Sequence, residues 1–181
     1  MKSICVFGVF VADLCFVADA IPEKGQTILG IKHIVGPGGK GSNQAITAAR
    51  LGGKVNFITK IGNDQNANMA LNLYQEAGIN TDSIIQDENQ LTGVAGIMIN
   101  EKTGDNAINI VPGAAGSLTN KDIDKNLSFI KNSEIFLTQL EVPKDVILHC
   151  LKTAKSNGCT TILNPAPASE ISKEFYNYID Y

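Results

Sequence analysis

Residues 36–51 read GPGGKGSNQAITAARL, a glycine-rich loop that runs into an alanine-rich helical pattern. Gly38 and Gly39 have no side chains, so backbone N–H groups there can approach a ligand closely. The first turn of the following helix directs its free N–H groups and positive dipole end to the same place. Lys40 adds a mobile positive charge, and Asn43 offers hydrogen-bond donors and acceptors. The stretch predicts a site for a small ligand rich in hydroxyls or negative charge.

This stretch has three possible interpretations, and the first two are known glycine-loop motifs. A P-loop is excluded, because its Lys must be followed by Ser or Thr, whereas Lys40 is followed by Gly41. The dinucleotide fingerprint G-x-G-x-x-G is matched by Gly36, Gly38 and Gly41, but Pro37 occupies the turn and other strand-like segments come first. A dinucleotide-binding loop and a tight turn without a ligand therefore stay open as alternatives.

The third interpretation is a family resemblance, carried first by GGKGSNQA followed by AARLG. This run resembles the amino-terminal signature of ribokinase-like sugar kinases, the PfkB family. IPEKGQTILG at 21–30 resembles the family's Pro-x-x-Gly-Glu-Thr segment, with Gln26 where Glu is usual. Three more segments resemble the ribokinase branch in the expected order: TGVAGIMIN at 92–100, QLEVP at 139–143 and NPAPA at 164–168. Together these segments cover nearly the whole chain.

The composition is that of a soluble globular protein. Hydrophobic residues make up 44% of the 181 residues, the net charge is −3, and there is no basic run, which argues against nucleic acid as a partner. No apolar run approaches the ~20 residues needed to span a bilayer. The four cysteines lack metal or C-x-x-C spacing, which predicts buried, reduced thiols. The apolar run after Lys2 imitates a secretory signal, but Gly8 and Asp13 interrupt it, so we expect a cytoplasmic protein.

Hydrophobic periodicity predicts strands that alternate with helices. The expected strands cover 4–8, 55–59, 135–139 and 159–163, and the expected helices cover 42–51, 64–77, 119–130 and 143–158, with a last short helix after Ser169. Ser42, Asp64 and Thr119 are the expected N-caps, and Pro143 is expected at the first helical position. This alternation predicts an α/β domain with a mainly parallel sheet.

Two pairs of extended segments interrupt the alternation, because no helix separates their members. Residues 11–18 and 28–35 flank a turn, and residues 92–100 and 107–111 flank a loop that contains Gly104. Both pairs are rich in apolar β-formers, so a small separate sheet is their expected location.

The resemblance implies a role for that sheet. The PfkB family places matching segments in a β-sheet lid over the sugar, which here gives lid segments at about 11–35 and 92–111. Residues 1–181 are then the amino-terminal part of one ribokinase-like domain. Ribokinases pair through this lid, so the resemblance also implies a homodimer.

Two carboxylates follow strands of the expected parallel sheet. Asp13 comes after the first strand, and Glu141 comes after the strand at 135–139. Because ligands in open α/β sheets lie beyond the carboxyl ends of the strands, we expect both carboxylates to converge on the loop at 38–43. A carboxylate accepts two hydrogen bonds at once, which suits neighbouring hydroxyls of a sugar.

The resemblance assigns roles to these residues. Asp13 matches the family's acceptor for sugar hydroxyls. Glu141 matches a carboxylate near the metal and phosphate region, which makes it the candidate residue for organising Mg²⁺. The ribose-binding loop is matched by Gly38, Gly39, Lys40, Gly41, Ser42 and Asn43. Asn164 lies in a matching segment without an assigned contact. The implied reaction transfers the γ-phosphoryl group of ATP to a primary hydroxyl of a pentose, ribose first, with Mg²⁺ and a monovalent cation as further cofactors.

The chain departs from the family pattern in two ways. Ribokinases usually carry Gly-Ser-x-Asn before the Asp, whereas this chain reads GVFV at 8–11, which removes one polar sugar contact. The Gly-Ala-Gly-Asp segment that carries the family's catalytic base and anion hole is not present. We therefore expect the sugar-binding half of a kinase, inactive by itself, with the base beyond Tyr181. A non-catalytic sugar-binding or interaction module is the alternative.

Overall fold

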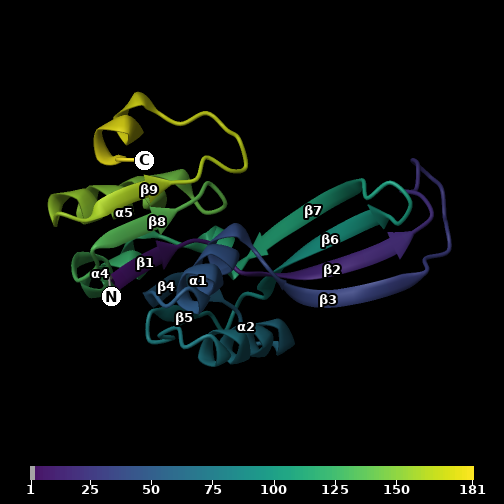
Figure 1. Cartoon of the computed structure of the whole chain (residues 1–181), viewed down its shortest axis with the longest axis horizontal. Coiled ribbons are helices and arrows are strands. Elements are labelled where there is room, and N and C mark those ends of the chain that lie inside the picture. The colour runs from purple at the N-terminus through teal and green to yellow at the C-terminus, as the bar shows by residue number, and fades with distance from the viewer. Residues whose placement is uncertain (1–2) are drawn as a thin grey trace.

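The computed structural model describes residues 3–181, which form two separate β-sheets (Figure 1). The larger sheet has five parallel strands in the order β5-β4-β1-β8-β9. Its strands are β1 (Ser3–Phe7), β4 (Lys54–Ile61), β5 (Ile84–Gln86), β8 (Ile135–Thr138) and β9 (Thr160–Leu163). This arrangement confirms the α/β prediction of a mainly parallel sheet.

Helices cover both faces of the larger sheet. One face packs against α1 (Lys40–Arg50) and α2 (Gln65–Glu76). The other packs against α3 (Asn120–Asp124), α4 (Leu127–Lys131) and α5 (Lys144–Ser156). Two short 3₁₀ helices, η1 (Ala114–Ser117) and η2 (Lys173–Tyr178), complete the helical elements of residues 3–181. None of these helices is long and apolar enough to cross a bilayer.

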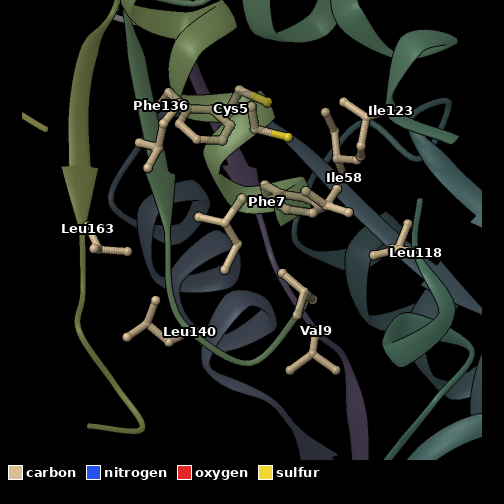
Figure 2. Packing of buried hydrophobic residues seen from close by; sticks show 14 of the residues in the cluster. Cys5, Phe7, Val9, Ile58, Leu118, Ile123, Phe136, Leu140 and Leu163 are labelled. Atoms are coloured by element: carbon tan, nitrogen blue, oxygen red, sulfur yellow. The ribbon is translucent and has the colours of Figure 1, made fainter. Parts of the chain in front are cut away.

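Strand β1 is buried on both sides because its side chains alternate between two apolar clusters. Val6 faces the α1 and α2 side, whereas Cys5 and Phe7 face the α5 side. Figure 2 shows Phe7 in this second cluster together with Ile58 and Phe136. All four cysteines are free, as expected, and Cys5, Cys150 and Cys159 are buried. Cys15 is partly exposed, which differs from the prediction of four buried thiols. Burial raises the pKa of the Cys5 thiol.

The smaller sheet extends away from the body of the molecule (Figure 1). It contains β2 (Val11–Ala18), β3 (Lys32–Gly38), β6 (Thr92–Asn100) and β7 (Asn106–Gly113) in the order β3-β2-β6-β7. The pairs β2–β3 and β6–β7 are antiparallel, and β2 and β6 join them in parallel. The separate sheet predicted from the extended pairs is therefore present, although β3 begins at 32 and not at 28.

Two predicted helix starts are confirmed. The Asp64 side chain caps α2 by accepting a 2.8 Å hydrogen bond from the Ala67 N–H. Thr119 and Asp122 form a capping box at the start of α3. The single helix expected through 130 is instead divided into α3 and α4. The Asn126 amide donates to the Asp122 carbonyl, a side-chain bond that competes with continued helix.

Three predicted helix starts are wrong. Ser42 is not an N-cap, because α1 begins at Lys40 and places Ser42 inside the helix. Pro143 precedes α5 and is not its first helical residue. No helix follows Ser169 directly; η2 begins at Lys173, after Ser172. The short strand β5 and the helix η1 have too few residues to show a periodic pattern.

Candidate functional site

The glycine loop connects β3 of the small sheet directly to α1. The strand ends at Gly38, and the chain turns at Gly39, whose φ of +90° is a conformation that favours glycine. A Cβ atom on Gly39 would also lie 2.5 Å from the Val9 carbonyl oxygen. The sequence therefore needs glycine at 39 to begin the helix so soon after the strand.

The first turn of α1 lies against the connection between β1 and β2. A Cβ atom on Gly41 would lie 2.8–2.9 Å from backbone atoms of Gly8 and Val9. The Ser42 N–H donates to the Val9 carbonyl at 3.1 Å. This close backbone contact brings the start of α1 to the carboxyl end of β1, where the parallel-sheet rule places ligands.

Asp13 lies on β2 beside the end of β3. Its carboxylate lies against the α-carbon of Gly38, which has no side chain. A Cβ atom on residue 38 would overlap the carboxylate oxygens of Asp13. No group within residues 3–181 donates a hydrogen bond to this carboxylate. Partial burial, and secondarily the charge of Glu141, raise the pKa of Asp13. The carboxylate is thus a half-buried acceptor available to a ligand.

Glu141 fixes the start of α1. It follows β8, and its side chain is only 8% exposed. One carboxylate oxygen accepts from the Lys40 backbone N–H and the other from Lys40 Nζ, both at 2.8 Å. Gln139, two residues earlier, is fully buried and donates its side-chain amide to Gln44 in the same helix. The QLEVP segment thus holds α1 in place at two points.

A pocket of about 210 Å³ lies where these elements meet. Its polar lining consists of predicted site residues, namely Asp13, Gly39, Lys40, Asn43 and Glu141. Its apolar lining comes from the small sheet, namely Val11, Ala95, Ile97, Ile108 and Ile110. The pocket therefore has one hydrogen-bonding side and one side that packs against carbon.

Three predicted site residues do not line the pocket. Gly38 and Gly41 shape it through the close backbone contacts described above. Ser42 is fully buried, and its hydroxyl accepts a 2.9 Å hydrogen bond from Tyr74 of α2. Its side chain therefore anchors α1 to α2. Asn164 also lies outside the lining, and its backbone N–H donates to Thr138.

The apolar side of the pocket was not predicted. Strand periodicity places alternate residues of β6 and β7 on one face, but it does not give the pairing between strands. That pairing sets Asp13 opposite Ala95, and Ala95 opposite Ile110, so all three share a face. The long-range register of β2 with β6 has no local sequence signal.

The structure does not provide the context that a dinucleotide fingerprint requires. In a Rossmann unit the glycine loop follows a parallel strand of the main sheet. Here Gly36 and Gly38 belong to β3, which lies in the small sheet and pairs antiparallel with β2. The literal match of G-x-G-x-x-G therefore arises from a different local structure.

Comparison with known proteins gives a match over the whole chain. The family model for pfkB family carbohydrate kinases matches residues 1–181. Ribokinase from Bacillus subtilis is 35% identical over 181 residues, which is 100% of this chain and 61% of that protein. The crystal structure of ribokinase from Thermotoga maritima has a TM-score of 0.89 at 36% identity, covering 100% of this chain and 58% of that chain.

A third relative is the Arabidopsis thaliana ribokinase, whose structure is complexed with ribose and ATP. It has a TM-score of 0.86 at 28% identity, covering 99% of this chain and 58% of that chain. The present chain therefore spans 58–61% of the length of these three relatives.

Proposed function

Because the chain belongs to the pfkB family of carbohydrate kinases, we propose that its pocket binds a pentose, with D-ribose as the first candidate. The whole protein would transfer the γ-phosphoryl group of ATP to a primary hydroxyl of that sugar. One observation carries the proposal: the carboxylate of Asp13 has no hydrogen-bond donor within residues 3–181 and faces a pocket that the glycine loop closes.

The pocket's chemistry supports a sugar ligand. The Asp13 carboxylate accepts hydrogen bonds from two neighbouring hydroxyls, and Lys40 and Asn43 supply donors. The C–H groups of a sugar ring pack against Val11 and Ile97 on the opposite side. The volume of about 210 Å³ lies below the roughly 300–1,000 Å³ of pockets for drug-sized ligands, which favours a ligand of monosaccharide size.

The same residues also hold the sugar in a fixed position. Glu141 holds Lys40 by two hydrogen bonds, so the ammonium group and the first turn of α1 are fixed before a ligand enters. We propose that the small sheet acts as a lid, because its apolar side chains cover the pocket and exclude water. The chain's residues thereby bind the sugar and orient its hydroxyls.

The described residues form no complete site for the cofactors that the family implies. Within residues 3–181 no group of three His, Cys, Asp or Glu side chains is placed to hold a metal ion. Both oxygens of Glu141 already accept hydrogen bonds from Lys40, so Glu141 is a poor Mg²⁺ ligand here. The pocket is also too small for a nucleotide beside a sugar. We therefore assign no residue of this chain to ATP, Mg²⁺ or a monovalent cation.

Binding and activity measurements together test whether this chain binds the sugar without transferring a phosphoryl group. Ribose binding by the 181-residue chain is measured by calorimetry, and ADP release is measured with ribose, ATP and Mg²⁺ present. Bacillus subtilis ribokinase is the positive control. We expect the chain to bind ribose and to release no ADP above background, because the Gly-Ala-Gly-Asp segment that carries the family's base is not in its sequence.

Either part of this expectation can fail separately. ADP release comparable to the control would contradict the assignment of a sugar-binding half only. A folded chain that binds no ribose or related pentose would contradict the sugar pocket. Binding of NAD in place of a sugar would support the dinucleotide alternative.

We also propose a homodimer that forms through the Asp13 face of the small sheet. Both faces of this sheet carry exposed apolar side chains, including Ile34 on the Asp13 face and Val35 on the other. At micromolar concentration we expect a dimer in sedimentation velocity experiments. Ile34→Glu is expected to dissociate it, whereas Val35→Glu, a matched change on the opposite face, is not. A wild-type monomer, or equal effects of both variants, would contradict a contact through the Asp13 face.

A further inference from the structure

A buried lysine lies at the end of β4, outside the pocket. Lys60 is 9% exposed, and its Nζ atom has three partners. Asp87 Oδ2 lies at 2.8 Å, Ser117 Oγ at 3.2 Å and Asp122 Oδ2 at 3.8 Å. The partners belong to three separate segments: the connection after β5, the end of η1 and the first turn of α3.

Two of these segments flank the β6–β7 hairpin. Asp87 lies in the connection that leads into β6, and Ser117 ends η1, which follows β7 directly. The hairpin supplies four residues of the pocket lining, namely Ala95, Ile97, Ile108 and Ile110. One ammonium group therefore ties the entry and the exit of the hairpin to the parallel sheet.

Hydrogen bonds connect this group to the hairpin backbone. The Ser117 hydroxyl accepts from Lys60 Nζ and donates to the Ala114 carbonyl at 2.8 Å. The Ala114 N–H in turn donates to the Leu91 carbonyl at 2.9 Å, immediately before β6. The two ends of the hairpin are thus bonded to each other and, through Ser117, to Lys60.

A second anchor lies beside the first and does not involve Lys60. The Gly62 N–H donates to Thr92 Oγ1 at 2.9 Å, and the Thr92 N–H donates to Asp64 Oδ2 at 2.7 Å. Because this anchor holds the start of β6 independently, loss of the Lys60 contacts should leave the hairpin folded on average while it opens locally more often. Lys60 also compensates the charges of Asp87 and Asp122, which removal of the lysine would leave unpaired.

We propose that Lys60 is a positioning residue that fixes the β6–β7 hairpin over the pocket, so that ligand affinity depends on a side chain that does not contact the ligand. The affinity part of this inference rests on the proposed function. The hold of Lys60 on the hairpin does not rest on it, and this hold is measured by hydrogen exchange without any ligand.

The experiment compares Lys60→Met with Lys54→Met, a matched change at the exposed first residue of the same strand. Hydrogen exchange is followed in residues 92–113 and, as a reference, in α5. In Lys60→Met we expect faster exchange in 92–113 and unchanged exchange in α5. Ribose affinity should fall roughly 2- to 30-fold, the range expected for a residue that acts through a network. Lys54→Met should resemble the wild type in both measurements.

Two further variants keep the inference testable if Lys60→Met is poorly folded. Lys60→Arg keeps the charge and should restore protection in 92–113. Ser117→Ala keeps the ion pair with Asp87 and should give a smaller change of the same kind. Unchanged exchange in 92–113 in a folded Lys60→Met protein, or equal acceleration in α5, would overturn the proposal. If the wild type binds no pentose while exchange responds as expected, the proposed function fails and the positioning role stands.

Discussion

Asp13→Asn is expected to raise the unfolding temperature of the free chain while it weakens ribose binding. The carboxylate of Asp13 is partly buried, lies near Glu141 and accepts no hydrogen bond from residues 3–181, so its charge opposes folding. The same charge is the acceptor that the sugar hydroxyls need. Removal of a charged hydrogen-bond partner costs about 1.5–3 kcal/mol of binding free energy, or roughly 10- to 150-fold in affinity.

The sign of the pH dependence of folding stability follows from the raised pKa of Asp13. Because the pKa of Asp13 is higher in the folded chain than its ordinary value of 3.8, the favourable contribution to stability is present below that value. It is lost as the pH rises through the folded pKa. Ribose binding needs the ionised form, so affinity should rise over the same pH window. Asp13→Asn should lack the contribution of Asp13 to both dependences, while Asp64 and Asp180, whose pKa values are lowered in the folded chain, still contribute to the pH dependence of stability.

Calorimetry and thermal melts at several pH values measure both effects. Asp19→Asn is the matched control, since Asp19 follows the far end of β2 and is 71% exposed on the surface, where it pairs with Lys102. That control should bind ribose like the wild type. If Asp13→Asn binds ribose with unchanged affinity, Asp13 does not belong to the sugar site.

Gly41→Ala is expected to destabilise the chain by about 3 kcal/mol, at the upper end of the cost of overpacking. The new methyl group would lie 2.8–2.9 Å from backbone atoms of Gly8 and Val9, which cannot move as a side chain can. For a chain of this size the expected fall in unfolding temperature is roughly 6–12 °C.

Gly36→Ala provides the matched control for this clash. Gly36 belongs to β3, its φ is not positive, and a Cβ atom there meets nothing within 4 Å. This variant should have nearly wild-type stability. Equal stabilities for Gly41→Ala and Gly36→Ala would show that α1 does not need the close approach to the β1–β2 connection.

Local sequence signals predicted the parts of this molecule that depend on local physics. The apolar strands and the turn glycines predicted the parallel sheet, and the absence of helices between extended pairs predicted the second sheet. Asp13 and Glu141 were expected to meet the glycine loop because each follows a strand of one parallel sheet. The structure brings these three features into one pocket.

The remaining features depend on contacts between distant segments. Ser42 has the chemistry of an N-cap, but the positive φ of Gly39 lets the helix begin earlier, and Tyr74 then binds the Ser42 hydroxyl. The apolar pocket wall depends on the register of β2 with β6, which local patterns do not specify. The partners of Lys60 are 27 to 62 positions away along the chain, so no local spacing indicates them.

The most direct test of the sugar pocket is a crystal structure of this chain with D-ribose bound. We predict ribose between Asp13 and Asn43, with two of its hydroxyls about 2.5–3.0 Å from the Asp13 carboxylate oxygens. Its C–H groups should contact Val11 and Ile97. Ribose bound elsewhere, with the Asp13 carboxylate still lacking a donor, would contradict the assignment of this pocket as the sugar site.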